Sequence, residues 1–166
     1  MSQLNYNHIL IPYDGSTLSG KVLPHVLVLS SAFNPKITLV EVVESLIEIN
    51  TKLAPLPNYT AGIYSTDLAK QVYKNETNAA EAHLKKLQQK LHEYGLVKVN
   101  IKVLHGNPAV EIVKFAKKEF CDLIVMSTHG RSGLKRLLIG SVTDQVLHQA
   151  NCPVLVVRPK IKSYNS

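Results

Sequence analysis

The sequence has 166 residues, of which 45% are hydrophobic, and 19 Lys and Arg against 12 Asp and Glu give a formal net charge of +7. This length suits one domain with a packed core and excludes two large domains. The composition excludes an intrinsically disordered chain, and no apolar run approaches the roughly 18 residues that a membrane span requires. We therefore expect a soluble globular domain.

The amino terminus, MSQLNYNHILIPYDG, has no basic segment followed by a long apolar one. No secretory signal is visible, and we expect a cytoplasmic protein. The two cysteines, Cys121 and Cys152, lie too far apart for a paired zinc or redox motif and are too few for a disulfide scaffold. They are expected to be buried apolar thiols.

The positive charge suggests a comparison with nucleic-acid-binding proteins, in which clustered Lys and Arg neutralise phosphates. Between positions 81 and 119, however, lysines are interspersed with glutamates, as on a solvated face. The segment 129–140 differs, because it contains Arg131, Lys135 and Arg136 and no acidic residue. We expect no nucleic-acid partner, and we expect this segment to suit a small anionic ligand.

Five short apolar runs predict β-strands. The first, fourth and last are nearly continuous Ile, Leu and Val, a pattern typical of parallel strands that are buried on both faces. Helical periods separate the runs, so the sequence predicts an open α/β sheet with right-handed crossovers. The predicted strands are His8–Tyr13, Ile37–Val43, Val97–Leu104, Asp122–Ser127 and Pro153–Arg158.

Apolar stripes at helical spacing lie between these strands. One covers residues 18–33 and contains Pro24, so we expect a kinked helix there. Another covers residues 84–94 and should stop at Gly95, since glycine is favourable just past a helix end.

Two later helices carry amino-terminal signals. Asn107 and Pro108 supply an N-cap and a first-turn proline for a helix that reaches Phe120. Ser141 and Asp144 occupy capping-box positions for a short helix that reaches Ala150.

The predicted domain covers residues 1–160, and residues 161–166 are expected to form a frayed tail. Residues 45–66 contain Pro55, Pro57 and Gly62 and show little periodicity. We expect a long irregular insertion there, either mobile or functional.

Residues that follow the first and fourth strands are candidates for ligand binding, because open α/β sheets bind ligands beyond the carboxyl ends of their strands. Asp14 could accept hydrogen bonds from ribose hydroxyls or cap a helix that starts near Ser16, and the sequence leaves both interpretations open. After the fourth strand, glycines and hydroxyl residues precede a helix whose first N–H groups belong to residues 141–143. This pattern favours phosphate binding over an ordinary glycine turn.

These segments resemble the universal stress protein family. The resemblance rests on residues 122–143, on CPVLVVR at 152–158, on HILIPYDGS at 8–16 and on Gly106–Pro108, and it covers the chain except for about residues 45–75. It implies an open five-stranded parallel sheet with helices on both faces, Rossmann-like or adenine nucleotide alpha hydrolase-like, with strand order 3-2-1-4-5. It also implies a stress-response sensor or signalling module that binds ATP or another adenine nucleotide, with or without Mg²⁺.

The resemblance further implies which residues bind the cofactor. ATP-binding members carry G-x-x-G, nine residues and then G-[ST]; Gly130 and Gly140-Ser141 match this motif, whereas Ser127 replaces its first glycine. The implied nucleotide site consists of Pro12, Asp14, Val42, Met126, Ser127, His129, Gly130, Arg131, Gly140, Ser141, Val142 and Thr143.

No catalytic residue and no metal site are predicted. The histidines form no three-ligand set, and without a Walker lysine we expect at most slow ATP hydrolysis. Two alternatives to the nucleotide sensor remain. One is a nucleotide-free protein-interaction module that uses the 45–75 loop, and the other is a flavodoxin-like carrier, which the basic charge and the absence of Trp disfavour.

In the strand order that the resemblance implies, residues 153–158 form a sheet edge. An edge strand leaves backbone N–H and C=O groups unpaired, and residues 154–157 carry no charge that would discourage pairing. We therefore expect a symmetric homodimer in which this strand pairs antiparallel with its copy.

Overall fold

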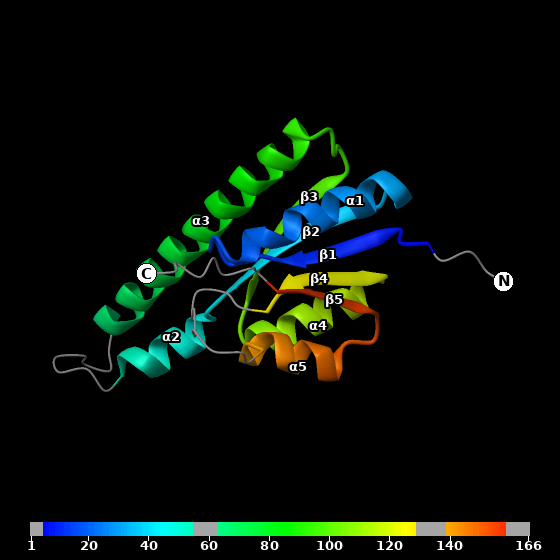
Figure 1. The fold of residues 1–166 in the computed structure, drawn as a ribbon. Coiled ribbons are helices and arrows are strands. Elements are labelled where there is room, and N and C mark those ends of the chain that lie inside the picture. Colours follow the sequence, from blue (N-terminus) through cyan, green and yellow to red (C-terminus); the bar gives the residue numbers. More distant parts are fainter. Residues whose placement is uncertain (1–4, 55–62, 129–138, 159–166) are drawn as a thin grey trace, which may run out of the picture.

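The computed structural model describes residues 5–54, 63–128 and 139–158, the side chains of residues 63–66 excepted. Five parallel strands form one sheet in the order β3-β2-β1-β4-β5, which confirms the expected topology (Figure 1). Each predicted strand is present within two residues of its expected ends. The strands are β1 (His8–Pro12), β2 (Lys36–Val43), β3 (Val99–His105), β4 (Leu123–Ser127) and β5 (Val154–Val157).

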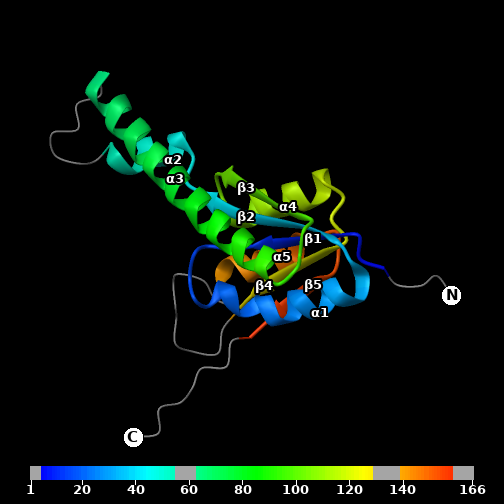
Figure 2. The ribbon, with the colours of Figure 1, turned by 90° about the horizontal axis from the view of Figure 1, so that it is seen from above.

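Helices cover both faces of the sheet (Figures 1 and 2). The helices α1 (Leu23–Phe33) and α3 (Ile63–Glu93) lie on one face, and α4 (Pro108–Lys118) and α5 (Ser141–Gln149) lie on the other. Ile9 packs into the core between the sheet and helices α1 and α3, whereas its neighbour Leu10 packs into the core between the sheet and helices α4 and α5. Successive strand residues point to opposite faces of the sheet. Burial on both faces explains why β1 and β4 have continuous apolar sequences.

The central strand β1 lies between β2 and β4. It pairs with β2 from His8 opposite Lys36 to Pro12 opposite Val40, and it pairs with β4 at Ile9 and Leu10. The strand order therefore reverses between β1 and β4. In open α/β sheets, ligands bind beyond the carboxyl ends of the strands at such a reversal.

Pro24 lies in the first turn of α1, so the expected kink is wrong. A 3-10 helix, η1 (Ser19–Val22), precedes α1, and Pro24 stands at its second position. Proline is favourable in the first turn of an α-helix, because its fixed φ suits the helix and the first N–H groups have no acceptor within that helix. The apolar stripe nevertheless runs through both helices, since Val22 and Val26 are fully buried.

Gly140 is the N-cap residue of α5, so the predicted capping box of Ser141 and Asp144 is wrong. Gly140 has extended backbone angles, and no side chain caps the helix. The first helical hydrogen bond joins the Asp144 N–H to the Gly140 oxygen at 2.9 Å. The three preceding N–H groups therefore have no acceptor within the helix.

The prediction that residues 45–66 form one long irregular insertion is wrong in part, because two helices occupy portions of this segment. The helix α2 occupies Leu46–Leu53, α3 begins at Ile63, and residues 55–62 lie outside the described residues. A capping box starts α2: Ser45 N–H donates to Glu48 Oε2 at 2.7 Å, and Glu48 N–H donates to Ser45 Oγ at 3.3 Å. The S-x-x-E motif at residues 45–48 could have predicted the start of α2. Hydrophobic periodicity could not, because eight residues are too few to show a clear helical period.

Two other expected helix boundaries are confirmed. Beyond the end of α3, Gly95 has a φ of +85°, and Leu96 N–H donates to Leu91 O at 3.1 Å. Asn107 caps α4, because its side-chain oxygen accepts from Val110 N–H at 3.2 Å.

Both cysteines are free thiols, and Cys121 is buried as predicted, whereas Cys152 is half-buried. The Cys121 sulfur lies 3.6 Å from Nδ1 of His8. Burial raises the pKa of Cys121 to about 12 and also raises the pKa of Cys152. The thiolate is the form that acts as a nucleophile or metal ligand, so these protonated thiols are poorly reactive at neutral pH.

His8 lies in the core near the amino-terminal end of β1. Its Nε2 is 2.8 Å from Thr38 Oγ1, and its Nδ1 is 3.1 Å from the Glu119 carbonyl oxygen. These partners suit a neutral ring that donates from Nδ1 and accepts at Nε2. Burial lowers the pKa of His8 below its ordinary value, although the contact with the Glu119 carbonyl opposes this shift.

We expect the free energy of unfolding to decrease as pH falls below about 6.5. In the unfolded chain His8 takes up a proton near that pH, whereas the folded protein resists protonation because the pKa is lowered. The stabilisation from neutral His8 is therefore complete above the pKa of His8 in the unfolded chain. It is lost as pH falls toward the lower pKa of His8 in the folded protein. Burial lowers the pKa of His105 as well, so His105 acts in the same direction.

Urea unfolding between about pH 7.5 and 5.5 measures this dependence. His8→Asn keeps an amide that can donate to Glu119 and should flatten the slope. The double variant with His105→Asn should flatten it further. If His8→Asn retained the full wild-type slope, the pH dependence would have to come from other groups.

Candidate functional site

A cavity of about 270 Å³ lies at the carboxyl ends of β1 and β4. It is close to the size of small-molecule sites in proteins. It occupies the point where the strand order reverses, which is where the sequence analysis expected a ligand.

All nine of the predicted site residues that the structure describes line this cavity. The other three, His129, Gly130 and Arg131, lie outside the described residues. The tertiary structure thus gathers residues that are more than a hundred positions apart in the sequence. The nine are Pro12, Asp14, Val42, Met126, Ser127, Gly140, Ser141, Val142 and Thr143.

Six residues that were not predicted to belong to the site also line the cavity. Val40 could have been found from Val42, because alternate residues of a strand share a face. Tyr13 and Thr128 directly follow named residues, whereas the other three come from segments that only the fold brings here. The six are Tyr13, Ser19, Val40, Pro108, Ile112 and Thr128.

One part of the cavity wall is apolar. Val40 and Val42 contribute from β2, Met126 from β4 and Ile112 from α4. Val40, Met126 and Ile112 are almost completely buried, so their positions are set by core packing. Such a surface suits a flat apolar group, such as an aromatic base.

The amino terminus of α5 forms another part of the wall. Gly140 N–H donates to Thr128 O at 2.8 Å, and the Thr143 hydroxyl donates to Ser127 O at 3.0 Å. These bonds hold the first turn of α5 against the end of β4. The N–H groups of residues 141–143 lack helical acceptors and carry the positive end of the helix dipole, an arrangement that favours an anion.

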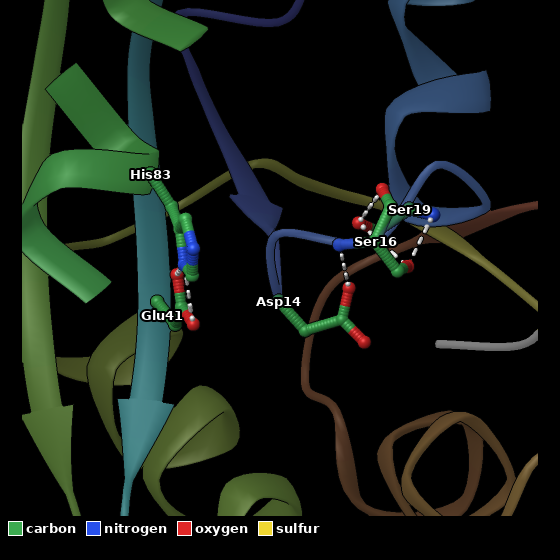
Figure 3. Close-up of polar contacts among 5 residues, drawn as sticks. All are labelled: Asp14, Ser16, Ser19, Glu41 and His83. Atoms are coloured by element: carbon green, nitrogen blue, oxygen red, sulfur yellow. Dashed lines mark hydrogen bonds and ion pairs between the residues drawn. The ribbon is translucent and has the colours of Figure 1, made fainter. Parts of the chain in front are cut away.

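Asp14 lies in a turn that follows β1. Ser16 N–H donates to Asp14 Oδ1 at 3.0 Å, and Ser19 N–H donates to the Ser16 hydroxyl at 3.1 Å (Figure 3). Because the first helical segment begins at Ser19 and its N-cap residue is Leu18, Asp14 is not a helix cap. Asp14 instead belongs to the residues that line the cavity.

Tyr13 lines the cavity next to Asp14. Burial raises the pKa of Tyr13, and the nearby carboxylates of Asp14 and Glu41 raise it further. The two parts of the site therefore offer different hydrogen-bonding groups to a ligand. The carboxylate at Asp14 suits hydroxyl donors, whereas the end of α5 suits a negatively charged group.

Within residues 5–54, 63–128 and 139–158, no group of three or more His, Cys, Asp and Glu side chains is arranged to hold a metal ion. Over the same ranges, no helix has the length and hydrophobicity needed to cross a bilayer.

The model of the universal stress protein family matches residues 5–158. The chain belongs to the universal stress protein family. The resemblance inferred from its motifs is therefore confirmed. Among its relatives, universal stress protein MJ0531 of Methanocaldococcus jannaschii is 38% identical over 153 residues, which cover 92% of this chain and 82% of the relative.

Solved structures of universal stress proteins have the same fold. The structure of MJ0577 from Methanocaldococcus jannaschii is 30% identical with a TM-score of 0.70, and the match covers 95% of this chain and 99% of that one. A universal stress protein family member from Arabidopsis thaliana, solved with AMP bound, is 22% identical with a TM-score of 0.59. That match covers 92% of this chain and 91% of the plant protein.

Proposed function

We propose that this universal stress protein binds an adenine nucleotide, such as ATP, ADP or AMP, in the cavity between β1 and β4, and that it acts as a sensor or signalling module. The observation that carries the proposal is the convergence of nine predicted site residues from separate segments on one cavity. The AMP bound to the Arabidopsis thaliana family member supports the choice of an adenine nucleotide.

Each part of the cavity suits one part of a nucleotide. The adenine base would pack against the apolar wall that includes Val42 and Met126. The ribose hydroxyls would donate to the Asp14 carboxylate, and the phosphates would accept from the N–H groups of residues 141–143. His129, Gly130 and Arg131, outside the described residues, complete the proposed phosphate site.

Ser127 stands where ATP-binding relatives carry the first glycine of their motif, and it is 7% exposed. Its backbone oxygen accepts the Thr143 hydroxyl, so the residue is held beside the first turn of α5. We propose that its side chain faces the phosphates and tunes affinity, without preventing binding.

We further propose a cytoplasmic protein whose universal stress protein domain covers residues 1–160. Its role would be nucleotide-dependent signalling with at most slow hydrolysis, with or without Mg²⁺. The biological unit would be a homodimer that pairs along β5.

Isothermal titration calorimetry with ATP, ADP, AMP and cyclic AMP, each with and without Mg²⁺, tests the proposal. At least one of these nucleotides should bind with a micromolar or lower dissociation constant, and GTP serves as the control for the base. Failure of all four would favour the nucleotide-free interaction module. A coloured purified protein would instead favour the flavodoxin-like carrier.

A further inference from the structure

Glu41 and His83 form a polar pair on the sheet face opposite the cavity wall. Glu41 belongs to β2, where its neighbours Val40 and Val42 line the cavity, so the Glu41 side chain points toward the α1 and α3 side. His83 belongs to α3, and its Nδ1 lies 3.2 Å and 3.3 Å from the two carboxylate oxygens of Glu41 (Figure 3).

The burial of Glu41 makes this contact important. The carboxylate side chain is 2% exposed, whereas the His83 side chain is 40% exposed. A buried carboxylate is costly unless hydrogen bonds or an opposite charge compensate it. His83 supplies such a partner from α3 and thereby ties that helix to the centre of the sheet.

The same imidazole packs against the backbone of the turn that carries Asp14. A Cβ placed on Gly15 would lie only 2.7 Å from Nδ1 and 2.9 Å from Cε1 of His83. Gly15 also has a φ of +80°, which side-chain-bearing residues rarely adopt. The ring therefore occupies the space beside Gly15, in contact with a turn that Asp14 and Ser16 close by a hydrogen bond.

We propose that Glu41 and His83 are positioning residues, a brace between α3 and the β1 turn that holds the Asp14 carboxylate in place for a ribose hydroxyl. Glu41 fixes the ring, the ring supports Gly15, and the adjacent Asp14 lines the cavity. The binding part of this inference rests on the proposed nucleotide function, whereas the brace itself is a property of the free protein. Loss of the brace loosens the ribose side of the cavity and leaves the phosphate side at α5 intact.

Amide hydrogen exchange of the nucleotide-free protein tests the brace directly. His83→Ala should increase exchange of the amides of residues 13–16 by about tenfold, since their local opening loses a packing partner, while amides of β4 and α5 keep wild-type rates. Glu41→Leu removes both acceptor oxygens at similar side-chain volume and should give an increase of the same kind, which serves if His83→Ala fails to fold. His92→Ala, at an exposed position of the same helix, is the matched control and should change nothing in this turn.

A second measurement separates positioning from general stability. The wild type should prefer an adenine nucleotide over its 2′-deoxy or 3′-deoxy form by about tenfold or more, because a hydroxyl bound to a carboxylate is a strong contact. His83→Ala should lose most of that preference, and His83→Gln, which can still donate to Glu41, should recover part of it.

The two proposals fail in different ways. A wild type that binds no nucleotide overturns the proposed function, while the exchange data still decide whether the brace exists. Wild-type exchange at residues 13–16 in both His83→Ala and Glu41→Leu overturns the brace. An unchanged ribose preference in a variant that binds nucleotide overturns its positioning role.

Discussion

Replacing Gly140 with valine should abolish measurable nucleotide binding, a loss of at least about 100-fold in affinity or about 2.7 kcal/mol. Gly140 lines the cavity and immediately precedes the N–H groups of residues 141–143. A branched side chain at this position adds bulk where the phosphates must approach the backbone. The fold should survive, because the φ of −62° and ψ of 150° at Gly140 are angles that valine adopts without strain.

Titration calorimetry with the best-binding adenine nucleotide measures this loss, and circular dichroism verifies that the variant is folded. Gln145→Val introduces the same side chain at an exposed position of α5 and should bind like the wild type. A folded Gly140→Val protein with wild-type affinity would remove this cavity as the nucleotide site.

Val156→Pro should convert the proposed homodimer into a monomer. β5 is an edge strand of the described sheet and pairs on one side with β4. Ile124 N–H donates to Pro153 O and Thr128 N–H donates to Val157 O, each at 3.0 Å. Because alternate residues of a strand bond to the same neighbour, the backbone groups of Val156 face away from β4, toward the expected partner strand.

Proline at position 156 removes one outward N–H and introduces a ring at the edge, while the hydrogen bonds between β5 and β4 remain. Light scattering at tens of micromolar should give about 37 kDa for the wild type and about 18 kDa for the variant, given the chain mass of 18.4 kDa. Val156→Thr keeps a β-branched residue and the N–H, so it should remain dimeric. A monomeric wild type would eliminate the dimer, and a dimeric Val156→Pro protein would place the interface elsewhere.

The sequence by itself determined the strands, their parallel arrangement and most of the residues that line the cavity. A strand buried on both faces needs an apolar residue at nearly every position, and that pattern is readable in β1 and β4 without a structure. Asn107 and Gly95 marked helix ends through local hydrogen bonding and backbone freedom, which depend on a few neighbouring residues. The cavity residues followed from the family resemblance, since its motifs lie at strand ends that meet in this fold.

Tertiary structure alone decided what distant segments do together. Pro24 lies in the first turn of α1 because the preceding residues form a separate 3-10 helix. Gly140, and not Ser141, is the N-cap residue of α5, and its N–H donates to Thr128 O at the end of β4. His83 of α3 contacts Glu41 of β2 and Gly15 of the turn after β1. The sequence around each of these residues gives no signal of that contact. Hydrogen bonds within one turn or helix end depend on neighbouring residues, so the local sequence predicts them. Contacts between a helix, a strand and a turn depend on how the helices pack on the sheet, which no single segment encodes.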